Sequence, residues 1–301
     1  MLPKDVIEQF RVKPGKRLRL KDLDTAWAPE DLVKPYGKKA VREKAEELLA
    51  QNVRELAEVQ NLLYASDTYA VLLIFQAMDA AGKDGAIKHV MSGVNPQGVQ
   101  VFSFKHPSAE ELDHNFLWRY AKAAPERGRI GIFNRSYYEE VLIVRVHPRL
   151  VAAQRIPGVG KIDKNFWRER FEDINAYERH LVRNGTVVLK FFLHLSKKEQ
   201  KKRFLERLDD PAKNWKFSAS DVEERRYWSD YMRAYEEALN ATSTDAAPWY
   251  VIPADRKWAA RTLISDVVVS TIQSLSLRYP ELGPEQRALL REARIALERE
   301  R

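Results

Sequence analysis

Residues 71–90 read VLLIFQAMDAAGKDGAIKHV, in which an apolar run leads into a turn of small residues and then a glycine and a lysine. This order resembles the phosphate-binding loop G-x-x-x-x-G-K-[ST], in which backbone N–H groups and the lysine hold phosphate oxygens. The sequence departs from that pattern twice, with Ala77 in place of the first glycine and Asp84 in place of the Ser or Thr that contacts magnesium. The residues predicted to bind phosphate here are Ala81, Gly82, Lys83, Asp84 and Lys88.

Asp79 lies inside this loop, where a carboxylate repels phosphate unless a cation or a phosphate-bound proton accompanies it. This acid offsets the missing hydroxyl at position 84, because it can hold magnesium or position an acceptor phosphate. An ordinary strand-to-helix turn of small residues is the structural alternative for the whole stretch.

The stretch IFNRSYYEEVLIVRVHP, residues 132–148, supplies a second set of candidate groups. Its strand ends at Asn134, whose carbonyl oxygen can face a metal-bound water. Arg135 follows with a planar fork that suits phosphate oxygens, and a salt bridge at the strand end is its alternative role. Glu139 restores a carboxylate just over one helical turn further on. We predict that Asp79, Asn134 and Glu139 hold the metal ion.

Arg203 and Arg207 lie four residues apart in the basic segment 196–208 and therefore share one helix face. Mobile arginines that close over a transferred phosphoryl group stabilise its charge and exclude water, and we predict this role for both. Lys213 and Lys216 follow in a polar loop as further phosphate contacts, with a solvated basic surface as the alternative. Three aromatic side chains near this segment are expected in the core, with stacking of one of them on a base as the alternative: Trp215, Trp228 and Tyr231.

The elements that must position these groups alternate along the chain. Apolar runs predict strands at residues 71–75, 98–104, 129–136, 186–195 and 248–254. Helical spacing predicts helices at 38–63, 85–92, 108–124, 164–183, 196–208, 221–239, 257–275 and 283–301. This order indicates an α/β fold with a parallel five-stranded sheet covered by helices on both faces. Such sheets bind ligands at the carboxyl ends of their strands, which is where the glycine-lysine loop falls.

The chain has 301 residues, 45% of them hydrophobic, which is enough for one large α/β domain. Cysteine is absent, so disulfides, thiolate metal sites and cysteine nucleophiles are excluded. A formal net charge of +8 suits an anionic partner such as nucleic acid, a nucleotide or another polyphosphate, although a solvated basic surface gives the same charge. No apolar run has the length of a membrane span, and the N-terminus lacks the apolar core of a signal peptide. We expect a cytoplasmic protein with no membrane or nucleic-acid partner.

Three stretches together resemble the polyphosphate kinase 2 family: QAMDAAGKDGAIKHVMSGVNPQG, FNRSYYEEVLIVRVHP and DDPAKNWKFSASDVEER. The details of MSGVNPQG and NRSYYEEVLIVRVHP are most similar to class III of that family. The resemblance extends over about residues 30–275 in order. It implies a P-loop kinase fold similar to thymidylate kinase, within a single domain over residues 1–301. The expected parts are an N-terminal extension and helix (1–65), a core (66–275) with a helical lid at about 197–225, and a C-terminal helix (276–301).

The resemblance also implies a reaction, the reversible Mg²⁺-dependent transfer of the terminal phosphoryl group of inorganic polyphosphate to AMP and ADP. The implied partners are polyphosphate, AMP, ADP, ATP, guanine nucleotides, Mn²⁺ as an alternative to Mg²⁺, and further copies of the chain in a dimer or tetramer. Many relatives have Asp where this chain has Asn134, a departure that fits the class III pattern. Carried over by position, the residues that fall on motif or lid positions are Asp79, Lys83, Asn134, Arg135, Glu139, Arg203 and Arg207.

Two other functions compete with this interpretation. An ATP-dependent nucleoside monophosphate kinase shares the fold, but Asp84 and the missing first glycine count against it. A non-catalytic protein that binds RNA or another polyanion is the second alternative. Asp79, Asn134 and Glu139 count against it, because acids serve no purpose in a purely anion-binding groove. Salt dependence would also separate the two, since a polyanion binder should weaken steeply with salt.

Overall fold

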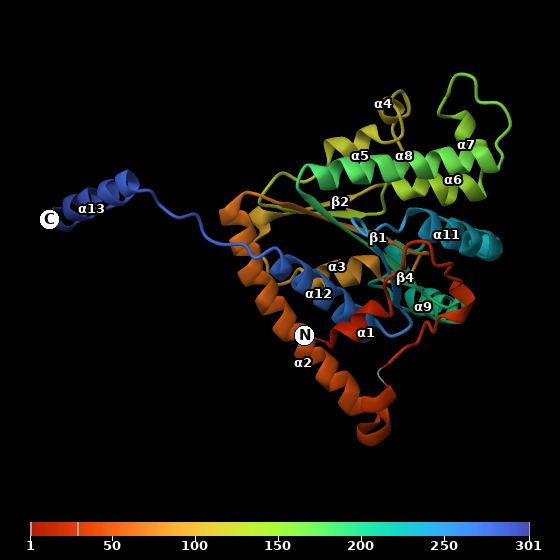
Figure 1. Cartoon of the computed structure of the whole chain (residues 1–301). Helices are drawn as coiled ribbons and strands as arrows, with labels where there is room; N and C mark the ends of the chain where they lie inside the picture. The colour runs from red at the N-terminus through yellow and green to blue at the C-terminus, as the bar shows by residue number, and fades with distance from the viewer. Residues whose placement is uncertain (1, 29, 301) are drawn as a thin grey trace.

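The computed structural model describes residues 2–28 and 30–300, without the side chains of residues 30–36, 38 and 216. At its centre lies a five-stranded sheet in the order β2-β3-β1-β4-β5 (Figure 1). All four neighbouring strand pairs are parallel, as the sequence predicts. The strands are β1 (Ala70–Gln76), β2 (Val99–Ser103), β3 (Ile130–Asn134), β4 (Thr186–His194) and β5 (Trp249–Pro253).

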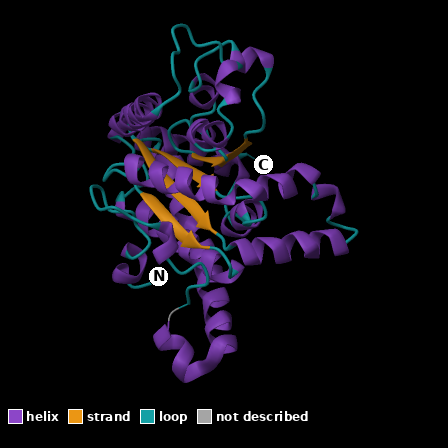
Figure 2. Cartoon of the chain, turned by 90° about the vertical axis from the view of Figure 1, so that its right-hand side faces the viewer, coloured by secondary structure: helices purple, strands orange, loops and turns teal. Residues whose placement is uncertain are grey.

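Helices cover both faces of this sheet, which Figure 2 shows as one twisted layer of strands between helical layers. The α-helices are α1 (Lys4–Glu8), α2 (Glu30–Ser66), α3 (Lys83–Val90), α4 (Ala109–Leu112), α5 (Trp118–Lys122), α6 (Ile143–Val146), α7 (Arg149–Ala152), α8 (Lys164–Arg183), α9 (Lys197–Asp209), α10 (Ala219–Glu224), α11 (Trp228–Thr242), α12 (Lys257–Ser274) and α13 (Pro284–Arg299). The 3₁₀ turns are η1 (Leu20–Asp22), η2 (Pro96–Gly98), η3 (Tyr137–Val141), η4 (Asn214–Lys216) and η5 (Arg225–Tyr227). None of the helices in the described part of the chain is long and apolar enough to cross a membrane.

The central strand β1 divides the hydrophobic core into two layers, because successive side chains of a strand point to opposite faces. Val71, Leu73 and Phe75 pack in one layer with α2, α3 and α12. Leu72 and Ile74 pack in the other with α5, α6, α8 and α11. All seven residues of β1 are buried, which explains its continuous apolar sequence.

The strand register brings the predicted site residues Asp79, Lys83 and Asn134 to one edge of the sheet. Asn134 at the end of β3 pairs with Phe75 of β1 on one side and with Ser103 of β2 on the other. The loop after β1 and the residues that follow β3 therefore lie side by side at the carboxyl edge. This is the edge at which open α/β sheets bind their ligands.

Two local predictions differ from the structure. The single helix expected at 108–124 is two short helices, α4 and α5, since the side chain of Asn115 accepts a hydrogen bond from the N–H of Leu117 and starts a new turn. Ser108 and Glu111 form a capping box at the start of α4. The helix expected to carry Glu139 is the 3₁₀ turn η3.

Candidate active site

The loop between β1 and α3, residues 77–82, forms the floor of the site. Ala80 has φ 61° and Gly82 has φ 106°, so both residues lie in the left-handed region. Glycine adopts this conformation freely, whereas a residue with a Cβ is strained there, and such strain gathers at functional sites. The turn lets α3 begin at Lys83, so that the unpaired N–H groups of its first turn lie at the cavity.

Lys83 is folded back under this loop. Its Nζ donates a hydrogen bond to the carbonyl oxygen of Ala77 at 2.9 Å, and its side chain is buried. Burial lowers the pKa of Lys83, and the neighbouring Arg135 guanidinium lowers it further. A phosphate group that enters the loop would bring negative charge next to Lys83. This charge would raise the pKa of Lys83 and hold its ammonium group in the charged form.

Arg135 and Asp79 form an ion pair across the site. Nη2 of Arg135 lies 3.0 Å from Oδ1 of Asp79, and both side chains are partly exposed. Arg135 has φ 66°, another left-handed residue directly after β3, and its N–H donates to the carbonyl of Phe75 at 3.0 Å. Glu139 raises the pKa of Arg135, so the guanidinium stays charged.

Asn134 contacts the acid that replaces the usual Ser or Thr. Its Nδ2 donates to Oδ1 of Asp84 at 2.8 Å and lies 3.5 Å from Oγ of Ser103. The amide therefore orients the Asp84 carboxylate at the start of α3. This contact gives position 84 a partner that the sequence pattern did not predict.

Glu139 lies behind Arg135 and does not line the cavity wall as a metal ligand would. Burial raises the pKa of Glu139, while Arg135 and Lys83 lower it. Gln76 supports it when the amide nitrogen of Gln76 faces the carboxylate, because it then donates to Oε1 at 2.9 Å. The position of Glu139 suits a role in holding the charge and orientation of Arg135.

These groups surround a cavity of about 820 Å³ at the carboxyl edge of the sheet. Its basic lining residues are Lys83, Lys105, Arg135, Arg203, Arg207, Lys213, Lys257 and Arg261. Its acidic lining residues are Asp79, Asp84, Glu206 and Asp221. The excess of cations fits a ligand with several negative charges. Asp79 and Asp84 lie at the loop, whereas Glu206 and Asp221 come from α9 and α10.

Arg203 differs from the prediction of a mobile arginine. Its guanidinium donates to the loop carbonyls of Ala80 and Ala81 at 3.1 and 2.8 Å and to those of Ala254 and Asp255 at 2.7 and 3.1 Å. Nε pairs with Glu199 at 3.0 Å. Five such contacts fix the side chain, so it ties α9 to the loop rather than closing over a ligand. Gln200 adds to this connection with a 2.9 Å hydrogen bond from Nε2 to the carbonyl of Asp79.

The other predicted lid residues lie in different positions. Arg207 lines the cavity, stacks over Phe204 with 5.4 Å from Cζ to the ring centre, and lies 3.5 Å from Asp221. Lys213 lines the cavity near its exposed mouth and pairs with Asp210. The side chain of Lys216 lies outside the described residues.

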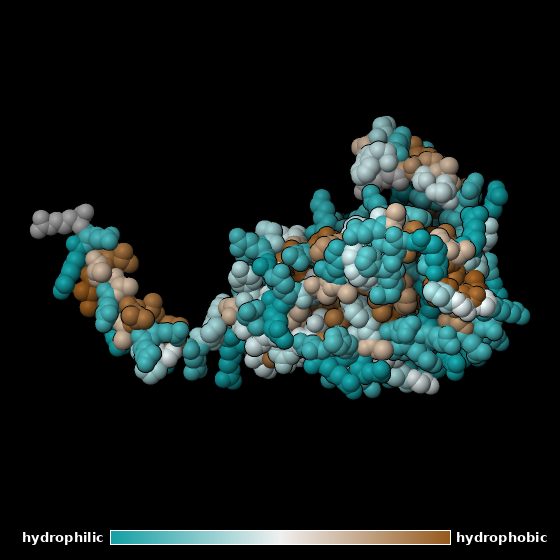
Figure 3. Space-filling model, turned by 90° about the horizontal axis from the view of Figure 1, so that it is seen from above, coloured by the Kyte–Doolittle hydropathy of each residue, from teal (hydrophilic) through white to brown (hydrophobic). Residues whose placement is uncertain are grey.

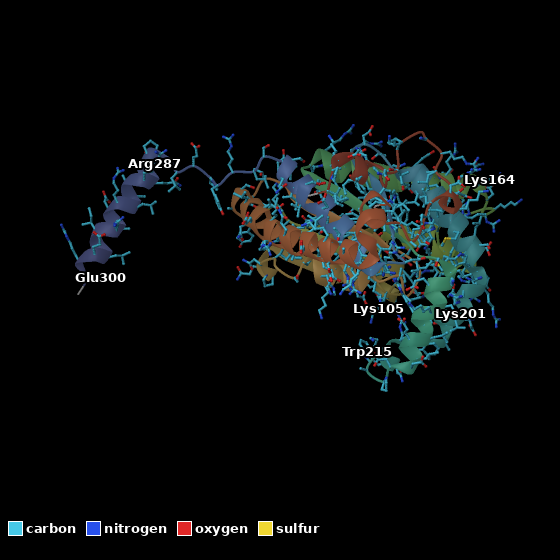
Figure 4. The ribbon with its side chains drawn as sticks, turned by 90° about the horizontal axis from the view of Figure 1, so that it is seen from below. Lys105, Lys164, Lys201, Trp215, Arg287 and Glu300 are labelled. Atoms are coloured by element: carbon cyan, nitrogen blue, oxygen red, sulfur yellow. The ribbon has the colours of Figure 1, made fainter. Side chains whose placement is uncertain are left out.

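Two side chains lie in positions that differ from what the sequence predicts. Lys88 lies on the exposed face of α3 and does not line the cavity, because it is more than one helical turn beyond Lys83. Trp215, expected in the core, is 76% exposed and lines the cavity mouth near the tip of the lid, where Figure 4 labels it. Tyr231 is buried as predicted, and Trp228 is half-buried against the core.

Three cationic residues of the cavity were missed from the sequence: Lys105, Lys257 and Arg261. Lys257 begins α12 directly after β5, and Arg261 follows one turn later. Burial and the nearby Arg203 lower the pKa of Lys257. Their positions after strands could have predicted them. Lys105 follows β2 and Lys257 follows β5, and the carboxyl ends of the strands are where such sheets bind ligands.

The oxygen donors at the loop fit a divalent cation of the Mg²⁺ type. Asp79 and Asp84 both line the cavity with Asn134 beside them, and Mg²⁺ is commonly held by one or two carboxylates together with substrate phosphates and water. No cluster of three or more His, Cys, Asp or Glu side chains suited to a metal occurs in the described ranges 2–28 and 30–300. Of the predicted trio, Asp79 and Asn134 line the cavity and Glu139 does not, while Asp84 lines it as a further carboxylate.

The parallel sheet and the loop between β1 and α3 at its carboxyl edge define a phosphoryl-transfer protein of the P-loop kinase class. Comparison with known proteins gives the family. The family described as Polyphosphate kinase 2 matches residues 39–279. The chain belongs to the polyphosphate kinase 2 family and is a phosphotransferase.

Individual relatives are similar over almost their full length. The chain is 55% identical to an ADP-polyphosphate phosphotransferase of Rhodopseudomonas palustris over 96% of this chain and 98% of the relative. It is 44% identical to an AMP/ADP-polyphosphate phosphotransferase of Meiothermus ruber over 91% of this chain and 96% of the relative. The crystal structure of polyphosphate kinase 2 from Arthrobacter aurescens superposes with a TM-score of 0.82 at 40% identity, over 95% of this chain and 96% of that one.

Proposed function

We propose that this chain transfers the terminal phosphoryl group of inorganic polyphosphate to ADP and AMP in a reversible reaction. The observation that carries this proposal is the cavity lining, in which cations extend on both sides of the phosphate loop and Asp84 stands where an ATP-binding loop has a hydroxyl. A ligand longer than a nucleotide triphosphate would use this full row of cations. The names of the two relatives support the same donor.

The acceptor is proposed to include both AMP and ADP, as in class III of the family. The Meiothermus ruber relative is named for both nucleotides, and the Rhodopseudomonas palustris relative for ADP alone. The class III assignment rests on the details of MSGVNPQG and NRSYYEEVLIVRVHP, with which Asn134 agrees. Guanine nucleotides are proposed as further acceptors, and the cytoplasm as the compartment in which these substrates are met.

The donor chain is proposed to run along the cations of α12 and the lid to the loop. Lys257 and Arg261 contact distal phosphates, and Arg207 and Lys213 contact the chain from the lid. At the loop, Lys83 and the N–H groups of α3 hold the terminal phosphoryl group. Arg135, held charged by Glu139, faces the acceptor phosphate.

Mg²⁺, or Mn²⁺ in its place, is proposed to bind Asp79 and Asp84 with the carbonyl oxygen of Asn134. When bound, the ion neutralises charge on phosphate oxygens. The chain's own side chains carry the rest of the catalysis by positioning and electrostatics, because phosphoryl transfer has a loose transition state and needs no covalent nucleophile. Lys83 and Arg135 stabilise the transferred charge, and the lid excludes water.

The test is incubation of the protein with magnesium, long-chain polyphosphate and AMP in the absence of ATP, with ADP and ATP followed over time. We expect ADP to form first and ATP to follow. Lys83→Ala should abolish both products. Lys88→Ala is the matched control on the same helix, and it should keep the parent rate because Lys88 lies outside the cavity.

Each other outcome has a distinct meaning. Formation of ATP from ADP but no product from AMP would restrict the acceptor to diphosphates. A reaction of AMP only with ATP as donor would make this an ordinary nucleotide kinase. Tight binding of polyphosphate without any product would support the polyanion-binding alternative.

A further inference from the structure

No residue of the C-terminal helix α13 lines the cavity of the candidate active site. It follows the segment 275–283 and stands away from the rest of the molecule (Figures 1 and 3). None of its residues is buried. An isolated helix of about this length is only marginally stable in water, so packing against something is expected to supply its stability.

One side of α13 is apolar. Successive residues turn by about 100° around a helix. Five side chains consequently fall on one stripe: Leu289, Leu290, Ala293, Ala296 and Leu297. The three leucines are 63%, 57% and 66% exposed, and Figure 3 shows hydrophobic side chains on this detached helix. A stripe of this kind on an unpacked helix indicates an interaction surface.

The two edges of the stripe carry opposite charges. Glu285 and Glu292 lie seven residues apart on one edge, and Arg287 and Arg294 lie seven apart on the other. When two copies of such a helix face each other in parallel, the acidic edge of one meets the basic edge of the other. In an antiparallel pair, like charges would meet along both edges. The charge pattern is thus complementary to itself in the parallel orientation only.

Arg294 is available for this contact. It pairs with Glu298 within the helix at 2.7 Å, but both side chains are mostly exposed. An exposed pair of this type is weak, so it can exchange for an equivalent pair between helices.

The position of α13 leaves the cavity open. α12 starts at the cavity with Lys257 and runs for 18 residues before the segment 275–283 begins. At 1.5 Å per residue this helix is about 27 Å long, so the arm leaves the opposite edge of the sheet. In a parallel pair the two helices begin at the same end, which places both connecting segments together.

We propose that α13 is an association arm that pairs in parallel with α13 of a second copy of this chain. The apolar stripe forms the contact, and the opposite charges of its edges set the orientation. This inference does not depend on the proposed reaction.

The molar mass of the full-length chain in solution tests the apolar stripe. We expect a multiple of the single-chain mass in light scattering coupled to size-exclusion chromatography. Leu297→Ser should lower this mass. Ile295→Ser is the matched control, since Ile295 is 48% exposed on the opposite side of the helix, and it should leave the mass unchanged.

Reversal of the charges on the edges of α13 tests whether its partner is α13 of a second copy. Arg287→Glu with Arg294→Glu makes both edges acidic, and Glu285→Arg with Glu292→Arg makes both edges basic. Each double variant should lose the larger species alone, and an equimolar mixture of the two should restore it. Arg291→Glu, on the back of the helix, should have no effect.

A single-chain mass for the parent, or equal masses for Leu297→Ser and Ile295→Ser, would overturn the proposal. Loss of the larger species without restoration in the mixture would also overturn it, because α13 would then pack on the body of the partner. Unchanged phosphotransferase rates per chain would show that the variants are folded.

Discussion

Asn134 and Asp84 show how the site tolerates an acid at the start of α3. Their 2.8 Å contact is a hydrogen bond because Asn134 carries a donor. A carboxylate at position 134 would lie against a second carboxylate, and two such groups repel unless a proton or a cation lies between them.

We therefore expect Asn134→Asp to lose about 1 to 3 kcal/mol of stability in the absence of divalent cations. Magnesium should restore most of this loss, because the ion binds between the two acids. The measurement is the melting temperature with EDTA and with magnesium. Asn165→Asp, at an exposed position in the first turn of α8, should show no magnesium-dependent change. An Asn134→Asp protein with the parent's melting temperature in EDTA would contradict the proposed pairing.

His194, at the carboxyl end of β4, is a buried titratable group. Burial lowers its pKa to about 4, against the small opposing effect of Asp255. Between pH 6.5 and about 4 the unfolded chain binds a proton at this residue and the folded chain does not. The free energy of unfolding therefore falls as the pH drops through this range, by up to about 3 kcal/mol.

Urea unfolding of the parent and of His194→Asn at pH 7, 6, 5 and 4 checks this expectation. The parent should lose more stability than the variant over this range. His180→Asn, an exposed histidine of α8, should follow the parent. Identical pH slopes for the parent and His194→Asn would show that His194 titrates normally in the folded chain.

At the scale of elements, a buried ion pair joins β4 to α8. Lys190 and Glu178 are paired with almost no exposure, and Lys190 also donates to the carbonyl of Thr242 at 2.7 Å. Glu178 accepts from the hydroxyls of Tyr137 and Tyr138 at 2.9 and 2.8 Å. This network holds η3, the turn that carries Glu139, against the sheet.

Lys190→Met should destabilise the fold by about 3 to 5 kcal/mol, because it leaves the Glu178 charge buried without its partner. Addition of Glu178→Gln should recover part of that loss, since the amide carries no charge. Chemical denaturation of the single and double variants measures both values. A double variant no more stable than Lys190→Met would mean that the charge of Glu178 is not the source of the loss.

The elements also show what the sequence could predict. Four strands follow directly from their apolar runs, because β1, β3, β4 and β5 are buried almost throughout. β2, at the edge of the sheet, is only partly buried and follows from its alternating sequence VQVFS. The carboxyl-edge positions of Asp79, Lys83 and Asn134 follow from the strand order. The break between α4 and α5 was missed because one side-chain hydrogen bond at Asn115 outweighs a helical pattern.

The lid could not be predicted in detail for a different reason. Arg203 and Arg207 share a helix face, but one is anchored to loop carbonyls and the other lines the cavity near Asp221. Helical spacing predicts which face of α9 a side chain lies on, but not which groups that side chain contacts. Lys257 and Arg261 were missed because their contribution depends on where α12 begins relative to the loop.

For the whole molecule, the basic cavity predicts a strong effect of salt. Exposed charges separated by more than about 8 to 10 Å are screened at physiological ionic strength. The proposed polyphosphate site uses cations spread from Lys257 to Lys213, whereas a nucleotide contacts fewer of them. We expect the KM for polyphosphate to rise severalfold between 50 and 300 mM potassium chloride, with a smaller rise in the KM for ADP. Equal rises for both substrates, measured by initial rates at saturating partner, would contradict an extended polyphosphate path.

The all-parallel sheet also has a consequence for synthesis on the ribosome. β1 is the central strand, but its neighbour β4 begins only at Thr186, more than a hundred residues later. At about 5 to 20 residues per second, one side of β1 stays unpaired for roughly 5 to 20 seconds after it leaves the exit tunnel. The apolar sequence AVLLIFQ is thus the segment of the nascent chain with most need of chaperone protection.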